Sequence, residues 1–199
     1  MLTQEQLAHV KLPLGGLRKD QVRVIAEKHG FINARKHDSQ DICFVPDGDY
    51  AKFIEKYTGQ KTPEGDFVDK EGNYIGRHKG IIHYTIGQRR GLGIPAASRL
   101  YVCEISPKTN TVVLGDNADL FSSELEADSV NLISVDSLAE PKRVTAKIRY
   151  RHKEQPATAW QTPDGILHVK FDEPQRAITK GQAVVMYDGD EVVGGGVIK

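Results

Sequence analysis

The N-terminal part of the chain carries apolar residues at helical spacing, and the pattern predicts three short helices. Thr3 followed by Gln6 is typical of a capping box, in which two side chains satisfy free N–H groups at a helix start. A second helix is expected over 19–29, with Gly30 at the position that ends it. A third, over 49–58, places apolar side chains on one face at Tyr50, Phe53, Ile54 and Tyr57.

From Gly65 onward the pattern changes from helical to alternating, which predicts short strands. Residues 67–68 and 74–75 flank a turn-forming run and are expected to form a hairpin. The further strand candidates are 81–86, 100–105, 112–114, 126–133, 143–150, 157–161, 166–171, 183–187 and 192–198. Regular short strands separated by turn residues are typical of a barrel or sandwich. The expected fold class is α+β then all-β, with a small mixed helical and β central domain over 1–120 and a β-barrel over 121–199.

Composition and charge narrow the function classes. The chain has 199 residues, of which 39% are hydrophobic and 27% charged, as in ordinary soluble globular proteins. It has no apolar run of about 18 residues and no signal-peptide pattern at its start, so we expect neither a membrane span nor secretion. Two cysteines fit a reducing cytoplasm better than a secreted disulfide scaffold. Because the formal net charge is +0, a nucleic-acid partner requires a local basic patch.

Cys43 is the first candidate for chemistry, because it stands in a polar, turn-rich segment over 34–47 and not in an alternating strand. A lone cysteine is usually a small buried hydrophobe, so a structural role is the alternative. The basic residues at 35–37 would lower the pKa of this thiol, whereas Asp38 and Asp41 would raise it. The loop context favours an accessible thiol.

Cys103 lies in a different pattern. It alternates with its neighbours so that Tyr101 and Ile105 share its strand face, which predicts a buried structural residue. The histidines do not predict a metal site, because His78 and His83 are five positions apart and no Cys-x-x-Cys or His-x-x-x-His pair occurs.

Two basic segments are candidates for binding. The run 147–153, if extended, would place Lys147, Arg149, Arg151 and Lys153 on one face, although charged stripes of this kind are often only solvated. The glycine-rich block Gly87–Gly93 could hold a phosphate through backbone N–H groups, with charge added by Arg89 and Arg90. Its alternative is a tight β connection with a solvated arginine pair.

Two blocks carry a family resemblance. Asp-Ser-Gln-Asp-Ile-Cys-Phe over 38–44 and His-Tyr-Thr-Ile-Gly-Gln-Arg-Arg-Gly-Leu-Gly-Ile over 83–94 resemble the bacterial tRNA-specific 2-thiouridylase (tRNA-uridine 2-sulfurtransferase) family. The similarity covers its central and C-terminal portion and runs over nearly the whole chain. That family opens with an ATP-pyrophosphatase domain that has a Ser-Gly-Gly-Val-Asp-Ser loop and another reactive cysteine. Neither is found here, so we expect the ATP site, with its Mg²⁺, to be missing.

The resemblance implies a sulfurtransferase that converts the wobble uridine of tRNA to 2-thiouridine. ATP would adenylate the C2 oxygen, and a cysteine persulfide would deliver sulfur. Cys43 would carry that persulfide from a sulfur-relay protein and form a disulfide with the missing cysteine. Arg149, Tyr150 and Gln182 would contact tRNA, although regular alternation would point Arg149 and Tyr150 to opposite faces. The barrel would be of the translation-factor type, and this portion alone would be inactive.

Two other function classes remain open at this point. One is a stand-alone RNA-binding β-barrel without catalysis, and the other is a thiol-redox module. An ATP-pyrophosphatase segment encoded upstream would favour the enzyme over both.

Overall fold

A computed structural model describes residues 2–36, 45, 48–95 and 98–199. It divides into two compact units, a helical unit over 2–57 and a β-rich unit over 58–199. None of the helices in these ranges is long and apolar enough to cross a membrane.

The helical unit contains α1 (Gln4–His9), α2 (Lys19–Lys28) and most of α3 (Tyr50–Thr58). The expected capping box is present, since the Gln6 backbone N–H donates to Thr3 Oγ1 at 3.1 Å and the Thr3 N–H donates to Gln6 Oε1 at 2.9 Å. Gly30 follows α2 with φ +71°, the left-handed conformation expected after a helix end. Neither α1 nor α2 buries a residue, and α3 buries Ala51.

The β-rich unit begins with a four-stranded sheet. Its strands are β1 (Gly65–Val68), β2 (Tyr74–His78), β3 (Tyr101–Ser106) and β4 (Thr111–Gly115), in the order β2-β1-β4-β3. The predicted hairpin is confirmed, because β1 and β2 pair antiparallel, while β1 and β4 pair parallel. The sheet's core consists of Phe67, Tyr84, Leu92, Val102, Val112 and Leu114.

The strand predicted over 81–86 is wrong. Ile81–His83 form a single turn of 3-10 helix, which begins after Gly80 at φ 114°. Tyr84 then points into the core, where its ring packs edge-on against Phe67 at a centroid distance of 5.1 Å. A buried aromatic anchor between two turns therefore produces the apolar pattern that resembled a strand.

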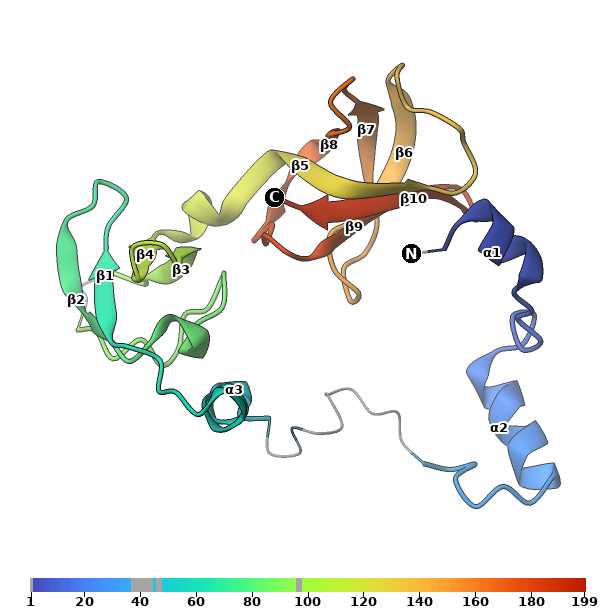
Figure 1. The fold of residues 1–199 in the computed structure, drawn as a ribbon, viewed down its shortest axis with the longest axis horizontal. Coiled ribbons are helices and arrows are strands. Elements are labelled where there is room, and N and C mark those ends of the chain that lie inside the picture. Colours follow the sequence, from blue (N-terminus) through green and yellow to red (C-terminus); the bar gives the residue numbers. More distant parts are fainter. Residues whose placement is uncertain (1, 37–44, 46–47, 96–97) are drawn as a thin grey trace. The chain divides into compact units, whose positions relative to one another are not determined.

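The second part of the β-rich unit is a closed barrel (Figure 1). Its strands are β5 (Phe121–Leu132), β6 (Lys142–Lys147), β7 (Gln155–Gln161), β8 (Leu167–Arg176), β9 (Ala183–Asp188) and β10 (Glu191–Ile198). They pair antiparallel in the order β10-β5-β8-β7-β6-β9, and β9 with β10 closes the ring. Alternate residues fill the interior, among them Phe171, Leu167 and Met186. The predicted succession of a helical and mixed part followed by a β-barrel is confirmed.

The extended basic stripe over 147–153 is wrong. β6 ends at Lys147, and residues 148–152 form a turn in which the His152 N–H donates to the Arg149 carbonyl at 3.0 Å. Ala146 pairs with Gln155, so the intervening residues must reverse the chain between β6 and β7. Ile148 is 2% exposed and belongs to the barrel core.

The prediction that Cys103 is a buried structural residue is also wrong. The pairing of β3 with β4 shifts between Val102 and Glu104, a β-bulge that leaves Cys103 without an opposite residue. Val102 takes the core position at 0% exposure, and Cys103 is only partly buried. Burial raises the pKa of the Cys103 thiol, and the nearby Asp119 carboxylate raises it further.

Candidate nucleic-acid interface

Arg149 and Tyr150 lie together in the connection between β6 and β7. Because the strand ends before them, they do not point to opposite faces of a sheet. The Arg149 guanidinium donates to the Arg176 carbonyl at 3.2 Å, which fixes its side chain across the barrel end. The Tyr150 side chain is 97% exposed, so its ring is available to stack on a base.

His152 is the last residue of this turn, and its side chain is partly buried. Its Nδ1 is buried and has no hydrogen-bond partner, and burial lowers the pKa of the imidazole, with a further contribution from the Arg149 charge. The ring therefore favours its neutral form, so Arg149 remains the charged group of the pair. The turn thus presents two arginines, Arg149 and Arg151, and one aromatic ring to solvent.

Gln182 lies in the turn that leads into β9. Its N–H donates to the Thr179 carbonyl at 3.2 Å, and its carbonyl accepts from the Ile198 N–H at 2.9 Å. Lys147 pairs with Val185, so the end of β6 and the start of β9 lie at the same end of the barrel. The structure therefore brings Arg149, Tyr150 and Gln182 to one barrel end, and their contact with tRNA stays a prediction.

Arg176, to which no sequence pattern pointed, connects this barrel end to the sheet. Its guanidinium donates to the Asn117 side-chain oxygen at 3.2 Å and to the Gly87 carbonyl at 3.4 Å. It also lies over the Tyr101 ring, 5.6 Å from the centroid. Since the same residue accepts a hydrogen bond from Arg149, Arg176 links the β6–β7 turn to the glycine-rich block.

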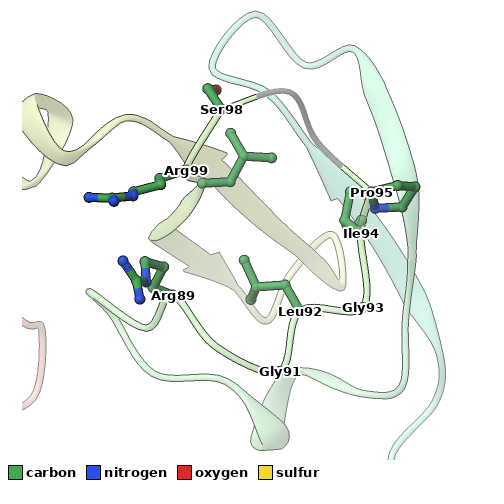
Figure 2. Close-up of a pocket in the computed structure, with 9 residues that line it drawn as sticks. Arg89, Gly91, Leu92, Gly93, Ile94, Pro95, Ser98 and Arg99 are labelled. Atoms are coloured by element: carbon green, nitrogen blue, oxygen red, sulfur yellow. The ribbon is translucent and has the colours of Figure 1, made fainter.

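The glycine-rich block forms one wall of a pocket (Figure 2). Gly87, Gly91 and Gly93 all have positive φ, which glycine adopts without steric cost. The pocket has a volume of about 460 Å³ and is lined by Arg89, Gly91, Leu92, Gly93, Ile94, Pro95, Ser98, Arg99 and Leu100. The block is a tight connection that also lines a pocket with Arg89, and phosphate binding by its backbone N–H groups stays a prediction.

Cys43 lies outside the described residues, so its surroundings add nothing to the prediction of its role. Among the described residues, no group of three or more histidine, cysteine, aspartate or glutamate side chains is placed to hold a metal ion.

Comparison with family models matches the chain in three consecutive segments. Residues 1–47 match the tRNA methyl transferase HUP domain, residues 51–116 the tRNA methyl transferase PRC-barrel domain, and residues 122–198 the aminomethyltransferase beta-barrel domain.

Curated relatives extend over the same segments. The chain is 56% identical to the tRNA-specific 2-thiouridylase MnmA of Clostridioides difficile strain 630 and 54% identical to that of Acetivibrio thermocellus, each over 198 residues. It is 52% identical to that of Lachnoclostridium phytofermentans over 197 residues. These alignments cover 99–100% of this chain but 55% of each relative, so the chain spans about half the length of the curated relatives it matches.

Proposed function

Because the chain belongs to the tRNA-specific 2-thiouridylase family, we propose that it is the central and C-terminal portion of a tRNA-uridine 2-sulfurtransferase. The enzyme would convert the wobble uridine of tRNA to 2-thiouridine. The observation that carries this proposal is the alignment of almost the whole chain, at 52–56% identity, with relatives of that name.

Cys43 is the proposed sulfur carrier. Its persulfide would attack C2 of the base and place the terminal sulfur there, as the bond from C2 to the adenylated oxygen breaks and that oxygen departs with AMP. A second cysteine thiolate would then attack Cys43 Sγ. That attack forms a disulfide, breaks the bond between the two sulfurs of the persulfide and leaves one sulfur on the uridine, so the two thiols supply the electrons. The second cysteine and the persulfide-donor protein lie outside this chain in the proposal.

The residues of this chain do not fit an ATP site. The 199-residue sequence contains no Ser-Gly-Gly-Val-Asp-Ser loop, and its match to the HUP domain ends at residue 47. We therefore derive no activation step from this chain and assign ATP, with Mg²⁺, to the remainder of the HUP domain that relatives carry.

The helices within residues 1–47, the segment that matches the HUP domain, support the proposal that the remainder of that domain packs against them. α1 and α2 bury no residue, yet the unit exposes apolar side chains such as Leu12 at 79%, Val24 at 65% and Phe31 at 61%. Exposed apolar surface on this scale is typical of a segment that packs against something else. We assign the remainder of the HUP domain to that role.

The catalytic part of the proposal is tested with two cysteine variants of the full-length enzyme. Cys43→Ser should abolish 2-thiouridine formation, measured by mass spectrometry of digested tRNA, without loss of tRNA affinity. Cys103→Ser is the matched control and should retain thiolation, because Cys103 lies on the outer strand of the sheet. Thiolation that survives Cys43→Ser would rule out the sulfur-carrier role.

The tRNA contact is tested with two tyrosine variants of the 199-residue chain. Tyr150→Ala should weaken tRNA binding by about 1–3 kcal/mol, the usual contribution of one stacked base. Tyr74→Ala is the control, since it removes a tyrosine that is 62% exposed on β2. Equal effects of the two substitutions on the dissociation constant would argue against a specific contact at Tyr150.

A non-catalytic RNA-binding barrel is the second candidate. It is favoured by one observation, that the barrel closes upon its own core without the helical unit. Thiolation by the full-length enzyme that depends on Cys43 would reject this alternative.

A further inference from the structure

The pocket beside the glycine-rich block has no task in the proposed sulfur transfer. Arg89 and Arg99 both line it, and in Figure 2 their side chains point toward the same side of the pocket. Leu92 lies at its base and is 8% exposed, so the wall between the two arginines is anchored in the core of the sheet.

Both arginines lack a counter-charge. Within the ranges that the structure describes, neither Arg89 nor Arg99 forms an ion pair or a hydrogen bond, and none of the described lining residues is acidic. Two other arginines of the unit differ: Arg77 and Arg143 each hold a carboxylate oxygen at 2.7 Å. Two guanidinium groups on one pocket without a carboxylate are suited to an anion.

The backbone that carries these arginines is held on both sides. The Gly87 N–H donates to the Val102 carbonyl at 2.8 Å, and the Val102 N–H donates to the Gln88 carbonyl at 2.9 Å. The Gln88 side chain also donates to the Arg90 carbonyl at 3.0 Å. The two segments that bear Arg89 and Arg99 are therefore bonded to each other, so a bound anion would not have to order the loop first.

Two hydrogen bonds join the glycine-rich block beside this pocket to the barrel end with the predicted tRNA contacts. Arg176 donates to the Gly87 carbonyl at 3.4 Å and accepts at its own carbonyl from Arg149 at 3.2 Å. A polyanion bound at Arg149 and Tyr150 would therefore lie at the end of the barrel that Arg176 connects to the glycine-rich block.

We infer that Arg89 and Arg99 form a second binding point for tRNA, one that holds a backbone phosphate and carries no sequence information. The inference rests on the proposed function, since it takes tRNA to be the ligand of the barrel end. An RNA phosphate fits better than a small nucleotide, because Arg89, Arg99, Gly91 and Ser98 are all exposed and the pocket is open to solvent.

The test measures tRNA affinity of the 199-residue chain as a function of salt. Arg89→Gln and Arg99→Gln should each lower affinity about tenfold, as expected for loss of a charged hydrogen bond. Each should also reduce the slope of log affinity against log salt by about one unit, and the double variant by about two. The effect should be the same for different tRNAs, because a phosphate contact does not read bases.

Arg77→Gln is the matched control, because it removes one positive charge from the same sheet where the guanidinium is already paired with Asp66. It should leave the slope within experimental error. Thermal unfolding of all variants should coincide with that of the unaltered chain, since Arg89 and Arg99 are exposed.

Three outcomes distinguish failure of the phosphate site from failure of the proposed tRNA contact. If the unaltered chain does not bind tRNA, the proposed tRNA contact itself fails. If Tyr150→Ala weakens binding while Arg89→Gln and Arg99→Gln do not, only the phosphate site is overturned. Micromolar binding of AMP or inorganic phosphate by calorimetry, lost in the double variant, would identify a small-ligand site and overturn the assignment to RNA.

Discussion

The barrel and the helical unit are built from similar shares of apolar residues but use them in opposite ways. The barrel encloses its apolar side chains, with Ala127, Leu167 and Val184 at 0% exposure. Among the described residues, twelve large hydrophobics of the helical unit are exposed, against four in all of 58–199. The barrel is therefore folded around its own core. The apolar side chains of the helices, in contrast, would be buried only by packing against another surface.

This difference separates two kinds of information in an amphipathic sequence. In β8 the alternation Leu167, Val169, Phe171 is satisfied within the unit, since each side chain is buried. In α2 the helical spacing of Val22 and Ile25 is equally regular, yet α2 buries nothing. Periodicity thus predicts which face of an element is apolar, but not which part of a protein covers it.

The largest expected effect comes from a pair of phenylalanines. Phe171→Ala in the barrel should lower the free energy of unfolding by about 3–5 kcal/mol, because it removes a buried ring and leaves a cavity. Phe31→Ala in the helical unit should change it by no more than about 0.5 kcal/mol, since that ring is 61% exposed. Urea unfolding of the 199-residue chain measures both. Similar losses at the two positions would mean that the helical unit has a core of its own.

Glycines give the next largest contrast. A Cβ at Gly195 would lie 2.2 Å from the Val184 carbonyl oxygen, so Gly195→Ala must push β10 away from β9 where the barrel closes. Overpacking of this kind costs about 1–3 kcal/mol. At Gly16 nothing lies within 4 Å of the added atom, and Gly16→Ala should be neutral or stabilise by about 0.4–1 kcal/mol through the unfolded chain. Thermal unfolding that shifts equally in both variants would contradict the contrast.

The elements that could be predicted from sequence are those whose cause is local. Thr3 and Gln6 cap α1 through residues three positions apart, and the turn between β1 and β2 is set by its own residues. The predictions that are wrong concern features that a strand distant in the sequence determines. The bulge at Cys103 depends on the register of β4, and the end of β6 at Lys147 depends on its pairing with β7 and β9.

The candidate site follows the same rule. The resemblance selected Arg149, Tyr150 and Gln182, and their roles stay predictions, but no local pattern pointed to Arg176. Its two side-chain partners, Asn117 and Gly87, are 59 and 89 positions away in the sequence. The placement of Arg89 and Arg99 on one pocket likewise requires the fold, because hydrogen bonds between Gly87, Gln88 and Val102 bring the two segments together.

The last predicted change is in the pH dependence of folding stability, and it arises from His152. The folded state lowers the pKa of His152, chiefly by burial, whereas the unfolded chain has the ordinary value of about 6.5. Below that value the unfolded state binds a proton that the folded state resists, so stability should fall as pH drops below about 6.5 and be retained above it. His152→Gln should flatten this part of the curve of unfolding temperature against pH, and His29→Gln, which removes an exposed histidine of the helical unit, serves as the control. If the two variants gave the same curve, the buried and unpaired Nδ1 of His152 would have no part in the pH dependence of folding.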